Sequence, residues 1–218
     1  MMTLGLDILL LTVDRDLRMV RDRENVGYAM MAADLIELTV ARRVQVVGRW
    51  TDWLQVIDAR PAGEPLLDAA LASLGAQLAA GKRLSPVDWM VKQPGRGAVD
   101  EGLALLQAQG AVGLYPRRVT SRLTLTEPVL LDQARQAGIR GRLDRFVAAG
   151  SAADVLDWAL AGLVHACRLW IPGHVDRAAD RRYKDAARGE RGKDGTDPVE
   201  ASIRILMQCA GSAHNRDP

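Results

Sequence analysis

Cysteines, histidines, aromatic residues and long apolar runs are all scarce in this 218-residue sequence. Its two cysteines, at positions 167 and 209, could form at most one bridge, which excludes a disulfide-stabilised scaffold. The longest apolar run near the start, residues 8–13, is too short to span a bilayer or to act as an export signal. Hydrophobic residues make up 48% and charged residues 26%, a composition that excludes a disordered chain. We therefore expect a globular protein of the cytosol.

The motifs of common enzymes and metal sites are also missing. The three histidines, His165, His174 and His214, form no HExxH and no pair at ligand spacing, so no metal is expected. Neither GxxxxGK[ST] nor GxGxxG occurs, which removes the two common phosphate-binding loops. Cys167 and His165 share an apolar segment, where a core thiol and a histidine between helices are the simpler interpretations. We find no catalytic residues and predict a protein that is not an enzyme and has no cofactor.

One pair of carboxylates stands out on a predicted helix. Asp34 and Glu37 lie three residues apart, so they share a helix face. Because no further motif accompanies the pair, it gives little support for acid–base chemistry. A salt bridge at the helix end is the simpler interpretation.

Positive charge is uneven along the chain. Arginine supplies 25 and lysine 4 of the 29 basic residues, against 27 acidic ones, and a net charge of +2 is too small to imply nucleic-acid binding. The segment 114–150 alone has seven arginines and three acids, among them Arg117, Arg118 and Arg122 in a predicted hairpin. Such a basic surface either meets the phosphates of lipid or nucleic acid or is a solvated helix face. The residues leave both interpretations open.

The low aromatic content, 4%, and the few β-branched runs predict a mainly α fold of one domain. The expected helices cover residues 26–41, 66–80, 86–89, 98–109, 126–138, 139–149, 151–170, 176–188 and 197–209. Ser85 and Asp197 are expected to begin two of these helices, and Ser151 with Asp154 resembles a capping box. Extended pieces at 43–47 and 53–57, and a second pair within 112–125, predict two β-hairpins, the second with a basic tip at residues 116–118. Residues 5–13 fit either a short strand or a helical turn, and 92–97 is expected to be the most flexible segment before residue 188.

A helix followed by a basic hairpin, at 98–125, is the order found in winged helix-turn-helix proteins, whose arginines contact DNA phosphates. The helix before this hairpin carries Asp100 and Glu101 but no basic residue, so it would read DNA poorly. A membrane surface is the other partner for such arginines, at about 1 kcal/mol for each. The residues by themselves do not decide between these partners.

Several motifs, in order along nearly the whole chain, resemble those of the Golgi phosphoprotein 3 family. They are DILLLTVD at 7–14, ADLIELTVARRVQV at 33–46, AGEPLLDAAL at 62–71, LLQAQGAVGL at 105–114, SRLTLTEP at 121–128 and ALAGLVHACRLW at 159–170. The Leu-Ile-Glu-Leu core and the Gly-x-Pro-Leu-Leu-Asp-x-Ala-Leu turn are fairly specific together. The resemblance implies one domain over residues 4–210, with 211–218 as a C-terminal tail.

The resemblance implies a central helical bundle with surrounding amphipathic helices and β-hairpins. The eukaryotic members are peripheral membrane proteins without enzymatic activity, which bind phosphatidylinositol 4-phosphate and engage the cytosolic tails of Golgi glycosyltransferases. The arginine-rich composition resembles a bacterial branch of the family. We therefore expect a cytoplasmic module that binds anionic lipid headgroups, peripherally on the inner face of a membrane. A scaffold that binds a protein partner or a second copy is the alternative, and nucleic acid is the least favoured partner.

The family's lipid pocket uses a tryptophan before the first long helix, an arginine near the start of that helix, and a later pair of arginines spaced three apart. By resemblance the tryptophan falls near residue 22 and the helix arginine near Met31. The pair falls at Arg96 and Val99, so only Arg96 matches. We expect the pocket to be largely lost, because one arginine cannot hold a phosphate with several charge-assisted hydrogen bonds. Arg21 and Arg23 are the candidate replacements.

Overall fold

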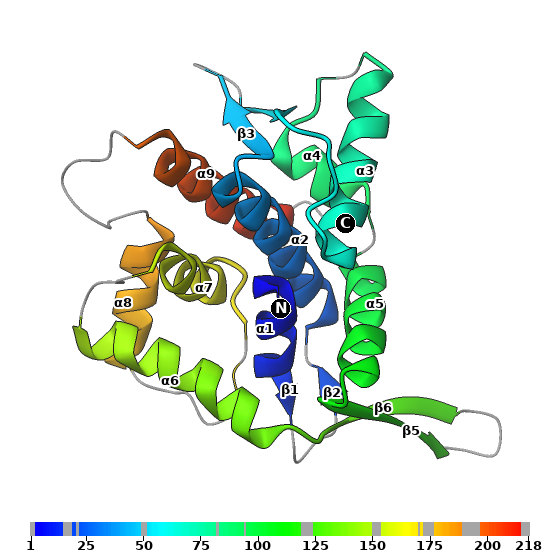
Figure 1. The fold of residues 1–218 in the computed structure, drawn as a ribbon. Coiled ribbons are helices and arrows are strands. Elements are labelled where there is room, and N and C mark those ends of the chain that lie inside the picture. Colours follow the sequence, from blue (N-terminus) through cyan, green and yellow to red (C-terminus); the bar gives the residue numbers. More distant parts are fainter. Residues whose placement is uncertain are drawn as a thin grey trace.

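A computed structural model describes residues 3–14, 19–20, 22–48, 52–81, 83–93, 95–118, 124–149, 154–169, 171, 177–188 and 197–214. Within them the helices are α1 (Leu4–Thr12), α2 (Arg23–Val40), α3 (Pro65–Ala79), α4 (Pro86–Val91), α5 (Gly95–Ala108), α6 (Gln133–Ala149), α7 (Val155–Ala166), α8 (Arg177–Ala187) and α9 (Pro198–His214) (Figure 1). The strands form three antiparallel pairs: β1 (Val13–Asp14) with β2 (Met19–Val20), β3 (Val44–Val47) with β4 (Trp53–Val56), and β5 (Val112–Arg118) with β6 (Thr124–Leu130). The mainly α, single-domain prediction is confirmed, and so are both expected hairpins.

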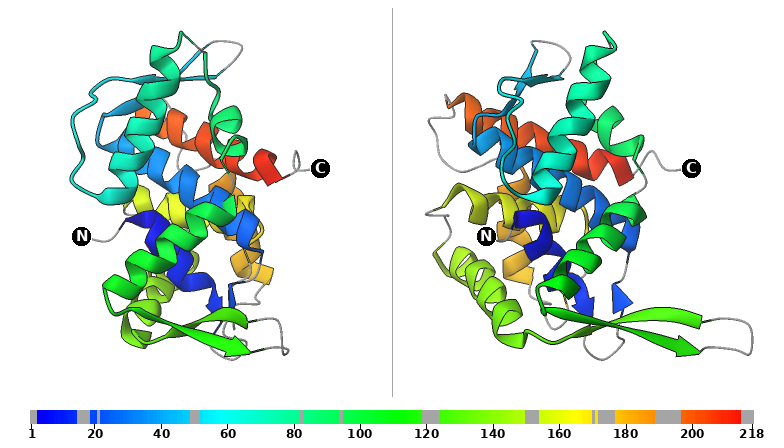
Figure 2. Two further views of the ribbon diagram at one scale, coloured as in Figure 1. Left: turned by 90° about the vertical axis from the view of Figure 1, so that its right-hand side faces the viewer. Right: turned by 45° about the vertical axis from the view of Figure 1, so that its right-hand side comes forward.

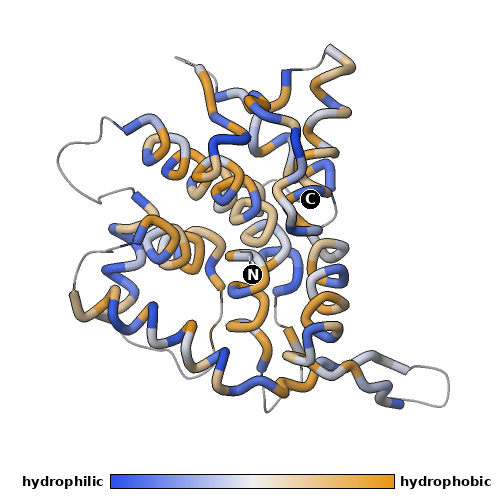
Figure 3. The backbone as a smooth tube through the Cα atoms, viewed as in Figure 1, coloured by the Kyte–Doolittle hydropathy of each residue, from blue (hydrophilic) through white to orange (hydrophobic). Residues whose placement is uncertain are grey.

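Helix α2 runs through the middle of the bundle, with α1, α3, α5, α7 and α9 packed around it (Figures 1 and 2). Fourteen of its eighteen residues are buried, because apolar and small side chains occur on nearly every side. The undecided run at residues 5–13 is mostly helical. Helix α1 begins at Thr3, whose Oγ1 accepts a hydrogen bond from the Leu6 N–H at 3.3 Å, and all its residues are buried. Figure 3 shows α1 as an almost continuously apolar segment.

Local capping signals place several helix ends correctly. Ser85 caps α4 by accepting from the Asp88 N–H, and Asp197 caps α9 by accepting from the Val199 N–H at 2.9 Å. Asp154 caps α7, whereas Ser151, predicted as its partner, lies outside the described residues. Helix α7 ends at Ala166, four residues before the predicted end.

The predicted start of a helix at residues 126–128 is wrong. These residues lie in β6, where Pro128 faces Leu114 across the ladder. Proline fits there because each strand of a two-stranded ribbon is an edge strand. The predicted helix end at Gly138 is also wrong, since α6 continues through it. Its buried residues recur at three- and four-residue spacing and form one stripe that extends beyond the glycine: Gln136, Ile139, Leu143 and Phe146.

The predicted tip of the second hairpin also needs correction. Pro116, Arg117 and Arg118 lie within β5, paired with residues 126, 125 and 124 of β6. The turn itself, with Arg122, lies outside the described residues. The long ribbon of β5 and β6 extends beyond the helical body on the side of α5 (Figures 1 and 2).

Candidate functional site

The first turns of α2 and α5 lie side by side and form a corner, here the α2/α5 corner (residues 23–27 and 95–99). Glu24 Oε1 accepts a hydrogen bond from the Gly95 N–H at 2.9 Å. The backbones approach so closely that a Cβ added to Gly27 would lie 2.0 Å from the Gly95 carbonyl oxygen. This contact explains why α5 begins at Gly95, three residues earlier than predicted. Arg96 therefore occupies the first turn of a helix and not a flexible segment.

Two of the predicted lipid-binding arginines belong to this corner. The Arg23 guanidinium donates a hydrogen bond to the Asp100 carboxylate of α5, and the Arg23 side chain is 31% exposed. Arg96 lies one helical turn before Asp100, so its position is on the same face of α5. The side chain of Arg96 and the whole of Arg21 lie outside the described part of the structure. The fold thus brings the backbone positions of Arg23 and Arg96 together.

Helix geometry adds positive potential to the α2/α5 corner. The first N–H groups of a helix have no partner within it, and the helix dipole places partial positive charge there. Asp22, the residue before α2, has a left-handed conformation with φ of 50°, and its side chain does not cap the helix. The N-termini of α2 and α5 meet here. The Glu24 carboxylate accepts from the Gly95 N–H and so offsets the partial charge of α5, whereas the partial charge of α2 adds to that of Arg23.

Of the three arginines predicted as a basic surface, the two that the structure describes do not belong to the corner. Arg117 and Arg118 lie on β5, where Arg118 is exposed, and Arg122 is among the residues not described. The same strand exposes 54% of Tyr115. These residues belong to the projecting ribbon.

The interpretation of Asp34 and Glu37 as a helix-end salt bridge is wrong. Glu37 Oε2 accepts from the Leu4 N–H at 2.9 Å, and burial raises the pKa of Glu37 to about 7. Asp34 is buried, its Oδ1 has no hydrogen-bond partner, and burial raises its pKa well above the usual range. Nearby, Arg142 of α6 binds Asp7 of α1 and Asp157 of α7, at 2.5 Å each.

This acidic cluster supports the packing of α1 rather than a metal site. Among the described residues no group of three or more potential ligands could hold a metal ion. The carboxylate of Glu37 holds the first N–H of α1, and Arg142 compensates the charge of Asp7. Sequence reasoning missed the cluster, although Asp7 in an otherwise apolar run was a visible signal.

The predictions for His165 and Cys167 are confirmed. His165 Nδ1 lies 3.2 Å from Asp180 Oδ1, so the imidazole lies between α7 and α8. Cys167 is 1% exposed, and burial raises the pKa of its thiol to about 12, which leaves it unreactive at neutral pH.

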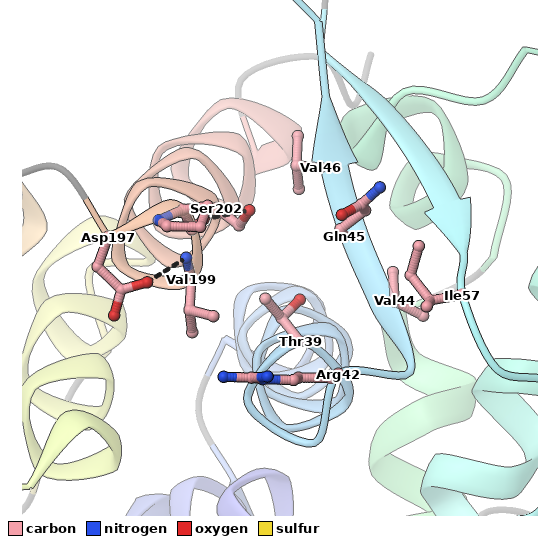
Figure 4. Close-up of a pocket in the computed structure, with 10 residues that line it drawn as sticks. Thr39, Arg42, Val44, Gln45, Val46, Ile57, Asp197, Val199 and Ser202 are labelled. Carbon is pink, nitrogen blue, oxygen red and sulfur yellow. Dashed lines mark hydrogen bonds between the residues drawn. The ribbon is translucent and has the colours of Figure 1, made fainter.

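A hollow of about 430 Å³ lies at the opposite end of α2, between β3 and the start of α9 (Figure 4). Its lining combines apolar and polar side chains: Thr39, Arg42, Val44, Gln45, Val46, Ile57, Asp197, Pro198, Val199 and Ser202. We call it the β3/α9 groove. Sequence reasoning missed it because α9 is distant in sequence from β3 and the end of α2. Arg42, directly after a helix where glycine is usual, was the only local signal.

Comparison with known families decides what kind of protein this is. The profile of the family described as Golgi phosphoprotein 3 (GPP34) matches residues 4–206, nearly the whole chain. The chain belongs to the Golgi phosphoprotein 3 family. The suspected resemblance is thereby confirmed. A search of curated proteins finds no significant match.

The Golgi phosphoprotein 3 family is a non-enzymatic, lipid-binding family, which agrees with the prediction that this member is not an enzyme. Among the described residues, no helix combines the length and the apolar character that crossing a membrane requires. The family assignment therefore directs attention to surfaces that meet a headgroup, and the α2/α5 corner is the one that contains two of the predicted arginines.

Proposed function

We propose that this protein is a peripheral membrane module that binds anionic lipid headgroups at the α2/α5 corner, with phosphatidylinositol 4-phosphate as the family's ligand. One observation carries the proposal. Arg23 and Arg96, distant in sequence, lie in the first turns of two helices that are joined by the bond from Gly95 to Glu24. A phosphate placed there would meet the Arg23 guanidinium and the positive end of α2, beside the backbone position of Arg96.

The ion pair between Arg23 and Asp100 fits such a site. The Asp100 side chain is 71% exposed, so its carboxylate holds Arg23 in a weak, solvent-screened pair. A phosphate carries more charge and more acceptor oxygens than a carboxylate, so it would compete well for the same guanidinium. Asp100 then holds the Arg23 side chain in the free protein, and a bound headgroup replaces Asp100 as the partner of Arg23.

The site we propose differs from the pocket of the eukaryotic members. Two of the positions expected to hold arginine contain buried apolar residues here: Met31 is 3% exposed and Val99 is fully buried. Arginine at either position would face the core. Headgroup binding would therefore rest on Arg23 and Arg96.

The projecting ribbon offers a second surface that suits a membrane. It extends from the helical body on the side where α5 lies and follows the C-terminal end of α5, the opposite end of that helix from the corner (Figure 2). Exposed Tyr115 can sit at the headgroup level, and Arg118 lies on the same strand. An aromatic ring and a guanidinium on one protruding element suit an anionic interface.

The packing of α5 counts against its use as a DNA recognition helix. Val99, Leu103 and Leu106 face the core, which leaves acidic residues Asp100 and Glu101 on the outer face. A recognition helix held in this way would present negative charge to the DNA groove. The winged-helix alternative therefore loses support, and a headgroup at the corner must displace Asp100 from Arg23.

Co-sedimentation with vesicles tests the proposal. Neutral vesicles, generic anionic vesicles and vesicles with phosphatidylinositol 4-phosphate are compared at low and physiological salt. We expect binding to the phosphoinositide vesicles that persists at physiological salt. Equal, salt-sensitive binding to every anionic vesicle would contradict a headgroup site and indicate only a basic surface. Absence of binding to all vesicles would overturn the membrane role.

A further inference from the structure

The β3/α9 groove lies at the far end of α2 from the α2/α5 corner. Helix α2 has eighteen residues, so the two sites are about 27 Å apart. A membrane at the corner would leave the groove accessible to a partner in solution. The groove and the corner have no residue in common, so a role for one does not depend on a role for the other.

One wall of the groove is the outer edge of β3. The Ile57 N–H donates to the Arg43 carbonyl, so residues 43, 45 and 47 form the hydrogen-bonded pairs with β4. The N–H of Leu54, opposite Val46, points away from β3 and donates to the Leu84 carbonyl. By the same alternation, the backbone groups of Val44 and Val46 point outward from β3, and no described residue bonds to them. Val44 is 1% exposed, so the accessible part of this edge is at Val46, which is half-buried.

The other wall and the floor set the character of the groove. Figure 4 shows the start of α9 facing β3, with the end of α2 between them. Val199 and Val46 contribute apolar surface, and Ile57 is 51% exposed at the margin. Asp197 is engaged by the Val199 N–H, and Ser202 donates to the Pro198 carbonyl. Most of the polar side chains in the groove are thus already bonded.

Arg42 is the exception. Its side chain is exposed and has no ion pair with any described residue. The residue closes α2 in the left-handed region, with φ of 56°, and its N–H and that of Arg43 donate to the carbonyls of Thr39 and Leu38. Glycine is the usual residue at this position of the helix end, because it adopts that conformation without strain. An arginine here keeps a strained backbone and adds a cation, unpaired among the described residues, to a groove that also contains the Asp197 carboxylate.

We propose that the β3/α9 groove binds the free C-terminus of a partner protein, with the terminal carboxylate on Arg42 and an apolar last side chain between β3 and α9. The outward backbone groups of Val46 would pair with the partner's last residue, as in strand addition to a sheet edge. The Arg42 guanidinium, which has no ion pair with any described residue, supplies the charge complementarity. A volume of about 430 Å³ is in the usual range for ligand pockets and suits a few residues rather than a folded surface.

A display library of random heptapeptides with free C-termini tests this proposal. Selection uses the full-length protein, with the Arg42→Gly variant as the counter-selection target. The most enriched peptide is synthesised as the free acid and as the C-terminal amide, and both are titrated by fluorescence anisotropy. We expect an apolar last residue, and about tenfold or greater weakening by either Arg42→Gly or amidation.

A matched control is available in Arg168, which closes α7 in the same way. It has φ of 51°, and its N–H and that of Leu169 donate to the carbonyls of His165 and Val164. Arg168→Gly removes the same charge and relieves the same backbone strain, so it should leave peptide affinity within about twofold. Neither change is expected to lower the melting temperature.

Three results would overturn the proposal. They are no enrichment over the Arg42→Gly target, equal affinity for the acid and the amide, and equal weakening by Arg42→Gly and Arg168→Gly. Vesicle binding of Arg42→Gly is measured in parallel and should match the wild type. A failure of the groove and a failure of the lipid site are thereby distinguished, since the peptide assay contains no membrane.

Discussion

Glu24 Oε1 accepts a hydrogen bond from the Gly95 N–H, joining the first turns of α2 and α5 across 71 residues of sequence. The bond forms where two glycines, Gly27 and Gly95, allow the helix backbones to approach without side chains between them. It places the positions of Arg23 and Arg96 beside each other. The candidate headgroup site is therefore a product of packing, and changes to that packing should affect it.

The first prediction concerns this close approach. Gly27→Ala would place a Cβ 2.0 Å from the Gly95 carbonyl oxygen, and since backbone cannot yield easily, we expect a loss of about 1–3 kcal/mol in unfolding free energy. Gly75→Ala in α3 is the control, because a Cβ there meets nothing within 4 Å. It should stabilise by about 0.5–1 kcal/mol through helix propensity. Urea unfolding measures both, and equal effects would contradict the tight contact.

The second prediction is a gain of function. Asp100→Asn removes the carboxylate that holds Arg23, so binding to vesicles with phosphatidylinositol 4-phosphate should strengthen. Glu101→Gln makes the same change in net charge on the next residue, which has no bond to Arg23. The increase should be at least about twofold larger for Asp100→Asn in co-sedimentation. An equal increase for both variants would show that only net charge matters.

The third prediction concerns pH. Burial raises the pKa of Glu37 from 4.5 to about 7, so the folded protein binds a proton that the unfolded chain has released. The contribution of this group to stability is fully present below pH 4.5 and is lost as the pH rises through 7. Wild-type stability should fall by about 2 kcal/mol between pH 5 and pH 8 from this group.

Glu37→Gln tests that dependence, because glutamine can still accept the Leu4 N–H without a charge. Denaturant unfolding at several pH values should give a flatter profile for the variant and greater stability than the wild type at pH 8. Some slope should remain, since Asp34 has its pKa raised in the same direction. Parallel profiles for the two proteins would show that Glu37 does not titrate in this range.

The fourth prediction separates a buried ion pair from a surface one. Arg142→Ala leaves Asp7 and Asp157 without their partner, and the Asp7 side chain is only 12% exposed. We expect a loss of about 3 kcal/mol. Arg60→Ala removes an 83% exposed partner of Asp58, which still pairs with Arg43, and should leave the melting temperature nearly unchanged. Thermal unfolding compares them, and similar losses would contradict a supporting role for Arg142.

Local signals predicted those parts of the fold that local physics controls. The apolar periodicity of α2 and the caps at Ser85 and Asp197 depend on neighbouring residues, so the sequence alone was sufficient. Pro128 and Gly138 were misread because a helix start and a ribbon edge both accept proline, and a buried stripe can carry a helix through glycine. The start of α5 required knowledge of its contact with Gly27.

In the candidate site, too, local sequence predicts some features and tertiary packing determines the others. Family resemblance identified Arg96 and suggested Arg23, but the ion pair with Asp100 and the neighbouring helix ends depend on tertiary packing. The β3/α9 groove was missed because its walls lie more than 150 residues apart along the chain. Single candidate residues could be chosen from the sequence, but the residues that lie beside them in the folded protein could not.

Vesicle binding by a charge-reversal variant shows whether a headgroup binds at the α2/α5 corner. Arg23→Glu with Arg96→Glu reverses both charges at the corner, and Arg181→Glu with Arg182→Glu makes the same charge change on exposed residues of α8. We predict that the corner variant loses phosphatidylinositol 4-phosphate vesicle binding at physiological salt by about tenfold or more, while the α8 variant stays within about twofold of the wild type. Equal losses for both variants, or full binding by the corner variant, would contradict a headgroup site at the α2/α5 corner.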